Sequence, residues 1–355
     1  MTFGLPPLPP RFEAALRDVH SRKVTARWMA AEALGRAPAG RRADAIDALW
    51  ILADDAAAEV RATALSALGN LRAVEALDLL LARFDDGDPT VRQVAMVAAA
   101  DLDDPRTLDA FRRALTAAHP DVRFQAVDAI AALSPDAGAE LAPRVDDDDD
   151  EVRAQLADVL GTVDGAAAAE ALGLLLGDPT PRVQRAAALS LARRGDGTGL
   201  GLVLEAIDDA ERRYEAVRAL GLLGAEEAAE PLARLAGSLL KPLSLRAEAG
   251  AALVRLGDRR GVAALRQVLG ALRSEGRSYA AQLVGELGLS ELAPHVAALA
   301  QRPRGADPLA VATALSALGR GAPGAEAGLR TLAARDDEAG AVARRALGTT
   351  DAGES

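Results

Sequence analysis

A short sequence phrase recurs eleven times along this chain of 355 residues, with spacings between 29 and 34 residues. Its clearest copies run from Glu59-Val60-Arg61 to Leu68-Gly69 and from Glu151-Val152-Arg153 to Leu160-Gly161. A fixed period in the range of roughly 20 to 50 residues is typical of repeat architectures, in which each unit packs only on its neighbours. The chain is therefore predicted to be a continuous stack of similar units.

The positions within each copy follow the period of an α-helix. The first regular position of a copy is its anchor, and the eleven anchors are Ala26, Val60, Val91, Val122, Val152, Val183, Arg212, Leu245, Gly276, Ala310 and Ala339. Four residues after the anchor, ten copies carry alanine, and eight residues after it every copy is apolar. Offsets 0, 4 and 8 trace one face of a helix, and the small residue at offset 4 lets a neighbouring helix approach closely.

Glycine stands at offset 9 in seven copies, at Gly35, Gly69, Gly161, Gly221, Gly285, Gly319 and Gly348. In that position glycine either permits close packing or begins to end the helix. Further helices are expected between these, for example over residues 41–53, 74–84, 105–117, 225–235 and 261–272, joined by turns rich in Asp, Gly and Pro. Each unit is thus predicted to be a pair of antiparallel helices, which gives an all-α solenoid, or superhelix, of about eleven stacked pairs.

Composition agrees with an all-helical fold and excludes several classes of site. Half of the residues are apolar but only nine are aromatic, and no β-branched run alternates with period two, so strands are not expected. The net charge of −11 argues against nucleic-acid binding, which depends on basic residues that neutralise phosphates. The absence of cysteine excludes disulfides and thiolate chemistry. No signal peptide or membrane span is visible, so a cytoplasmic location without membrane contact is expected.

These motifs resemble the HEAT-repeat family, in particular the short bacterial HEAT-like repeats that also occur in phycocyanobilin lyases. The matching features are the turn aspartates, the Val-Arg pair, the alanine at offset 4 and the Leu-Gly at offsets 8 and 9, and they cover about residues 12–348. We expect a proline-rich extended segment over residues 1–10, a single solenoid over 11–348 and a flexible tail over 349–355. The resemblance predicts the fold more strongly than the function, because one fold serves many unrelated functions.

An arginine follows the anchor in eight copies, at Arg27, Arg61, Arg92, Arg123, Arg153, Arg213, Arg246 and Arg277. A stripe of this kind could bind anionic ligands. The resemblance to HEAT-like repeats instead implies a structural ladder, in which each arginine pairs with a turn aspartate such as Asp55, Asp88, Asp121, Asp150 or Asp209. The regular spacing favours the ladder.

No catalytic constellation, metal site or cofactor site is recognisable in the sequence. His20, His119 and His295 are far apart and share no repeat position. The acidic run 146–150 lacks the alternation of a calcium loop and is expected to be a solvated turn that caps the next helix. Glycines 195, 197, 199 and 201 lack the strand and the Gly-Lys-Ser/Thr sequence of phosphate loops, so a flexible turn is expected there.

Function is expected at the outward offsets 2, 3, 6 and 10 of the anchor helices. In HEAT-like solenoids, the resemblance implies, the second helix of each pair lines the concave surface. Aromatic side chains set among polar ones favour a protein interface, although such rings could equally fill gaps between repeats. The predicted binding face consists of Trp28, Glu32, Phe124, Gln125, Asp128, Gln155, Asp158, Tyr214, Glu215, Arg218, Tyr279 and Gln282. Glu248 and Glu286 are also expected to point outward.

The first hypothesis for the function is a noncatalytic scaffold or adaptor that binds a protein or peptide on its concave face. The acidic content of that face predicts a neutral to basic partner. The family resemblance suggests an alternative, a bilin lyase or chaperone-like subunit. A more remote alternative is a DNA glycosylase of the HEAT-like kind, which would require a basic groove.

Overall fold

The computed structural model describes residues 12–102, 104–272, 274–301 and 305–349, and these residues form helices and turns without any strand. The predicted extended segment 1–10 and tail residues 350–355 lie outside the described residues. The chain divides into two compact units, residues 1–186 and 187–355. None of the described helices combines the length and the apolar character that a membrane crossing requires.

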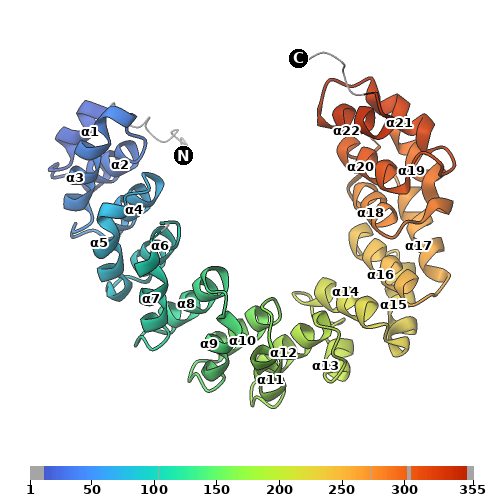
Figure 1. The fold of residues 1–355 in the computed structure, drawn as a ribbon, viewed down its shortest axis with the longest axis horizontal. Helices are drawn as coiled ribbons and strands as arrows, with labels where there is room; N and C mark the ends of the chain where they lie inside the picture. Colours follow the sequence, from blue (N-terminus) through green and yellow to red (C-terminus); the bar gives the residue numbers. More distant parts are fainter. Residues whose placement is uncertain (1–11, 103, 273, 302–304, 350–355) are drawn as a thin grey trace. The chain divides into compact units, whose positions relative to one another are not determined.

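Unit 1 contains the helices of the first six sequence copies (Figure 1). They are α1 (Phe12–Asp18), α2 (Val24–Leu34), α3 (Arg42–Leu52), α4 (Ala58–Asn70), α5 (Leu77–Ala82), α6 (Pro89–Ala100), α7 (Pro105–Ala114), α8 (Pro120–Leu133), α9 (Ala137–Leu141), α10 (Asp150–Leu160), α11 (Ala166–Leu175) and α12 (Pro181–Arg193), whose last residues belong to unit 2. Short 3-10 helices are η1 (Ala39–Arg41), η2 (Val74–Ala76), η3 (Arg83–Asp85) and η4 (Ala142–Arg144).

Unit 2 continues the same alternation (Figure 1). Its helices are α13 (Leu200–Glu205), α14 (Arg213–Leu223), α15 (Ala229–Gly237), α16 (Leu243–Arg255), α17 (Arg260–Leu269), α18 (Ser274–Glu286), α19 (Ala293–Ala300), α20 (Pro308–Leu318), α21 (Ala325–Ala333) and α22 (Glu338–Leu347), with η5 (Glu226–Ala228) and η6 (Ser290–Leu292). The even-numbered helices α2 to α22 carry the anchors or begin directly after one, and we call them the anchor helices. Together with the odd-numbered helices they make the predicted α-solenoid of helix pairs.

Among the helices predicted between the anchor helices, the segments 41–53, 105–117 and 261–272 contain regular α-helices, whereas 74–84 and 225–235 are less regular. The segment 74–84, for example, begins and ends in the 3-10 helices η2 and η3, with only Leu77–Ala82 in α-helical form. At the starts of several anchor helices the turn chemistry is as expected. Asp88 accepts hydrogen bonds from the amides of Thr90 and Val91, and Pro89 is the first residue of α6. The Asp149 side chain caps α10 in the same way.

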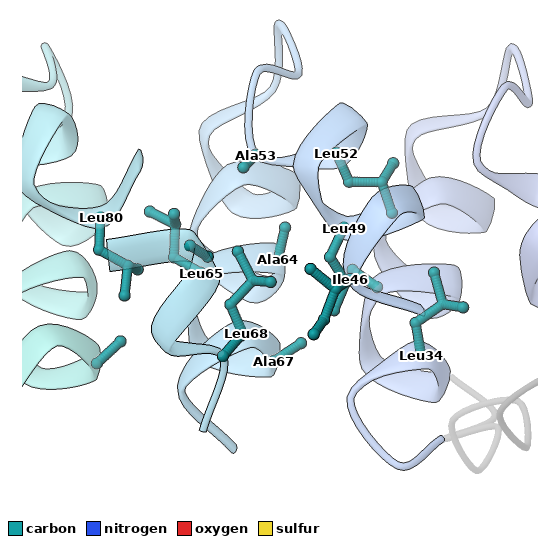
Figure 2. Close-up of a cluster of buried hydrophobic side chains, with 14 of the residues drawn as sticks. Leu34, Ile46, Leu49, Leu52, Ala53, Ala64, Leu65, Ala67, Leu68 and Leu80 are labelled. Atoms are coloured by element: carbon teal, nitrogen blue, oxygen red, sulfur yellow. The ribbon is translucent and has the colours of Figure 1, made fainter. Parts of the chain in front are cut away.

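Packing within each unit runs from anchor helix to anchor helix. In unit 1, α2, α4, α6, α8 and α10 contact one another in order, and in unit 2 α14, α16, α18, α20 and α22 do the same. The alanines at offset 4 are all buried. Figure 2 shows how Leu34 of α2, Leu49 of α3 and Leu68 of α4 meet in one apolar cluster. The apolar offsets therefore contribute to core clusters within residues 15–102 of unit 1 and 247–343 of unit 2.

Glycine at offset 9 has two different roles. Gly69 and Gly221 lie where a Cβ atom would stand 2.9 Å from the Cβ of Ala98 and 2.7 Å from the Cα of Ala252, respectively. There the missing side chain permits two anchor helices to touch. Gly348, in contrast, ends α22 with a φ of 73°, a left-handed conformation that glycine adopts without a steric penalty. The glycine at offset 9 thus permits close packing in some copies and ends the helix in another.

Unit 1 contains a ladder of arginine–aspartate pairs along its turns. Arg27 donates to Asp55 at 2.8 Å, Arg61 to Asp86 at 2.6 Å, Arg92 to Asp121 at 2.8 Å, Arg123 to Asp147 at 2.7 Å and Arg153 to Asp178 at 2.7 Å. Each arginine comes from one copy and its aspartate from the next. Two expected partners are wrong: Asp88 and Asp150. Asp88 is occupied as the cap of α6 and Asp150 is the first residue of α10, so the aspartates five residues before the anchor, Asp86 and Asp147, take the pairs.

The ladder aspartates also connect through their main chain. The carbonyl of Asp55 accepts from Arg61 at 2.9 Å, that of Asp86 from Arg92 at 2.8 Å, that of Asp147 from Arg153 at 2.7 Å and that of Asp178 from Gln184 at 2.7 Å. Each of these residues therefore binds the preceding copy with its side chain and its own copy with its carbonyl. We call Asp55, Asp86, Asp147 and Asp178 the ladder carboxylates.

Opposing effects set the pKa of the ladder carboxylates. Burial alone would raise the pKa of Asp86, but the hydrogen bonds from Arg61 and from the Asp88 amide outweigh it, so the pKa lies below its ordinary value. The same balance lowers the pKa of Asp147 and of Asp178. For Asp55 the hydrogen bond from Arg27 is the largest cause of the lowered pKa. These carboxylates are therefore ionised at neutral pH.

In the described part of unit 2, the arginines that follow the anchors bind backbone and amide oxygens. Arg213 donates to the carbonyls of Ile207 and Asp208, not to the carboxylate of Asp209. Arg246 is buried and donates to the carbonyl of Ala236 and to Gln267. Arg277 donates to the carbonyl of Leu272 at 3.4 Å. These hydrogen bonds tie each turn to its helix.

Candidate binding surface

The outward offsets of the anchor helices line cavities in both units. In unit 2, helices α14, α16 and α18 bring together a cavity of about 480 Å³, the unit 2 pocket. It is lined by Arg193, Tyr214, Glu215, Arg218, Ala219, Leu222, Glu248 and Tyr279. Four residues of the predicted face, Tyr214, Glu215, Arg218 and Tyr279, therefore meet at one place.

The unit 2 pocket combines apolar surface with charged side chains. Leu222 is 54% exposed, and the hydroxyls of Tyr214 and Ser244 are hydrogen-bonded at 2.7 Å. Glu215 lies 3.4 Å from a guanidinium nitrogen of Arg193 and 3.2 Å from one of Arg212. Arg218 is exposed and forms no hydrogen bond or ion pair with any residue that the structure describes. The pocket thus offers an apolar contact area beside one uncommitted guanidinium.

Glu248 corrects one expectation from the sequence. It occupies outward offset 3 of α16, yet its side chain is only 2% exposed, because Tyr279 of α18 covers it. The Tyr279 hydroxyl donates to this carboxylate, and Arg255 lies 3.9 Å from its other oxygen. Burial, followed by the hydrogen bond to Glu248, raises the pKa of Tyr279 well above its ordinary value of about 10. Tyr279 is therefore partly a structural residue, whereas Tyr214 is exposed.

In unit 1, the outward offsets line two cavities that share Gln93. One, of about 310 Å³, lies over α4 and α6, and the other, of about 360 Å³, lies over the starts of α6, α8 and α10. Together they form the unit 1 groove, lined by Ser66, Gly69, Asn70, Pro89, Thr90, Gln93, Val94, Val97, Ala98, Asp101, Pro120, Asp121, Phe124, Gln125, Asp149, Glu151 and Val152. Phe124 and Gln125 of the predicted face belong to it.

The remaining residues of the predicted face lie apart from the two cavities. Asp128 of α8 accepts a hydrogen bond from Gln155 of α10, and burial raises the pKa of Asp128 while this bond opposes the rise. Asp158 is half-buried on α10. Trp28 is exposed on α2, and Gln282 is exposed on α18. Glu32 of α2 pairs with Arg36 at 2.8 Å. The predicted face is therefore several local sites and not one uniform surface.

Some contributors to these cavities were not predicted. Val97 is 51% exposed in the unit 1 groove, and Leu222 contributes an apolar side chain to the unit 2 pocket. Val97 stands at outward offset 6 and Leu222 at outward offset 10. An apolar residue at an outward offset is the feature of the sequence that indicates such a contact surface. At the turns of unit 2, Leu239, Leu240 and Leu272 are highly exposed. Leu239 and Leu272 line, with Lys241, a cavity of about 430 Å³. The acidic turn 146–150 is accounted for by the pairs of Asp147 and Asp148 with Arg123 and by the cap at Asp149.

Among the residues that the structure describes, no group of three or more histidine, aspartate or glutamate side chains could hold a metal ion. The fold and these surfaces define an all-α repeat protein. A family model for HEAT repeats matches residues 9–100, 80–161 and 138–213, and one for the PBS lyase HEAT-like repeat matches residues 212–238. The chain belongs to the HEAT-repeat family. No curated protein matches the chain.

Several solved structures are similar to this chain. YibA of Escherichia coli is 16% identical, with a TM-score of 0.52, over 69% of this chain and 92% of that one. The karyopherin Kap121p bound to Nup53p is 15% identical, with a TM-score of 0.46, over 98% of this chain and 46% of that one. Human deoxyhypusine hydroxylase is 23% identical, with a TM-score of 0.30, over 69% of this chain and 96% of that one. The similarity to YibA concerns the fold alone.

Proposed function

We propose that the protein is a noncatalytic scaffold that binds a protein or peptide on the outward face of its anchor helices. The observation that carries this proposal is the convergence of outward offsets from successive helices on the unit 1 groove and on the unit 2 pocket. Half-exposed Val97 and Leu222 supply apolar contact area there, and Phe124 and Tyr214 supply aromatic surface. Apolar and aromatic anchors among polar groups are the usual composition of a protein-binding site. The net charge of −11 favours a neutral to basic partner.

The proposal is tested by affinity capture with matched variants of the full-length chain. In the face variant, Trp28, Phe124 and Tyr214 are replaced by alanine. In the control variant Trp50→Ala, the ring removed is equally exposed but belongs to α3, which is not an anchor helix. We expect wild type and control to retain the same partner, and the face variant to bind the purified partner at least about tenfold more weakly. Equal binding by all three, with equal helix content by circular dichroism, would refute the proposed face.

The match of residues 212–238 to the PBS lyase HEAT-like repeat favours a second candidate, a bilin-handling subunit. The matched segment contains Tyr214, Arg218 and Leu222 of the unit 2 pocket. Co-expression with a bilin chromophore tests this candidate. A coloured complex that is lost in Tyr214→Ala would support it, and a colourless protein would remove it.

A further inference from the structure

The unit 1 groove differs from the unit 2 pocket in its charges. Its charged lining residues are all carboxylates: Asp101, Asp121, Asp149 and Glu151. The unit 2 pocket is lined by two arginines and two glutamates. In addition, no outward offset of α4, α6, α8 or α10 carries lysine or arginine in the sequence. An acidic lining is thus a specific property of this groove.

The basic residues next to the groove only partly neutralise it. Arg92 pairs with Asp121 at 2.8 Å and Arg182 with Glu151 at 2.9 Å. Asp101 forms no ion pair within the described part of the chain. The Asp149 side chain accepts the two backbone amides at the start of α10, and its charge interacts with that of Arg123. One carboxylate, Asp101, therefore faces the groove without a cationic partner.

Amide side chains along the groove are equally uncommitted. The side-chain amides of Asn70, Gln93 and Gln125 form no hydrogen bond with any residue that the structure describes. Each amide offers two N–H donors and one oxygen acceptor. An extended peptide presents N–H and C=O groups that such side chains bind irrespective of sequence. The three amides come from α4, α6 and α8, so they lie in order along the groove.

Phe124 supplies the complement to a cationic side chain. It is half-buried in the same cavity that Pro120 and Asp149 line, and it makes no ring contact within the described residues. A lysine or arginine side chain packs its methylene groups on such a ring, and its charge is attracted to the ring face and to neighbouring carboxylates. The acidic residues Asp121, Asp149 and Glu151 lie at this end.

We propose that the unit 1 groove binds an extended peptide segment, with a lysine or arginine side chain seated at Phe124 and the peptide backbone held by Asn70, Gln93 and Gln125. The inference rests on the proposed scaffold function and names the chemistry of its partner. Packed helices lie about 8–10 Å apart, so α4 to α10 span roughly 27 Å, and an extended chain rises about 3.3 Å per residue. The bound segment is therefore about eight or nine residues long.

The test begins with a random library of 12-residue peptides displayed on phage and selected on the immobilised full-length protein. We expect enriched peptides to share a lysine or arginine at one fixed position. A fluorescent copy of the strongest peptide is then compared with copies in which that residue is norleucine or glutamate. Fluorescence anisotropy should show about tenfold weaker binding for norleucine and a larger loss for glutamate.

Two matched variants locate the site. Gln93→Lys places a positive charge in the groove, and Gln301→Lys makes the same change at an exposed glutamine that follows α19, outside the anchor helices. We expect Gln93→Lys to weaken the basic peptide on the order of tenfold through like-charge repulsion, and Gln301→Lys to leave it unchanged. Enrichment without a cationic residue, no enrichment, or equal binding by both variants overturns the inference. If the natural partner is still lost in the Trp28, Phe124 and Tyr214 variant, the scaffold function stands on its own.

Discussion

Replacing Gly221 by alanine provides the sharpest test of how the anchor helices pack. Gly221 is buried in α14, and an added Cβ would lie 2.7 Å from the Cα of Ala252 and 2.8 Å from its Cβ in α16. Because the nearer atom is backbone, no side-chain rotation relieves the overlap. Overpacking of this kind costs about 1–3 kcal/mol, and alanine returns about 1 kcal/mol through its higher helix propensity. The difference between these two effects is an expected fall in the free energy of unfolding of about 1 kcal/mol.

Gly173→Ala is the matched control for this substitution. Gly173 lies in the interior of α11, is exposed, and has no atom within 4 Å of an added Cβ. Only the helix-propensity gain operates there, so stability should rise by about 0.5–1 kcal/mol. Urea unfolding followed by circular dichroism measures both effects, and native-state hydrogen exchange assigns the loss to α14 and α16. If Gly221→Ala stabilises the protein as Gly173→Ala does, the close approach of these helices is refuted.

Two further predictions concern buried charge. The ladder carboxylates have lowered pKa values, so their stabilisation is complete above about pH 5 and is lost as pH falls below about 4 towards the folded pKa. Urea titrations at pH 6 and pH 3, followed by the fluorescence of Trp28 and Trp50, which both lie in unit 1, should show this loss, and an unchanged midpoint would contradict it. Tyr279→Phe leaves the buried Glu248 without its hydroxyl donor and should cost about 1–3 kcal/mol in the same titration followed by circular dichroism. Tyr214→Phe, which removes an exposed hydroxyl, should cost less than about 1 kcal/mol; equal costs would argue against the buried pair.

The fold could be predicted because every copy of the repeat gives the same evidence for helices. Eleven copies of one apolar pattern leave little choice between helix and strand, and the buried alanines follow from the period alone. The intervening helices were predicted in the right places, but the segments 74–84 and 225–235 include 3-10 helices that were not expected. In segment 74–84 only Leu77–Ala82 is α-helical. A sequence pattern of this length does not distinguish an α-helix from an α-helix with 3-10 ends.

The partners of side chains were harder to predict than their positions. Asp86 and Asp88 are alternatives in sequence, and only the geometry of the turn shows that Asp88 caps its own helix while Asp86 reaches Arg61. Glu248 stands at an outward offset, yet a tyrosine 31 residues later in the chain covers it. Such contacts join neighbouring copies, and the pattern within one copy contains no information about them. The cavities depend on the same contacts, which is why Val97 and Leu222 were not singled out.

Each ladder carboxylate residue binds two neighbouring copies, and this limits how the chain can gain or lose residues. In each of these turns the aspartate precedes the arginine or glutamine that it binds by six residues, as in Asp55 and Arg61 or Asp178 and Gln184. Removing one residue from such a turn would break the bond inside the copy and misplace the carboxylate for the copy before it. Removing a complete copy, in contrast, presents the next aspartate at the same position. The first half of the chain is therefore expected to lengthen or shorten only by whole repeats.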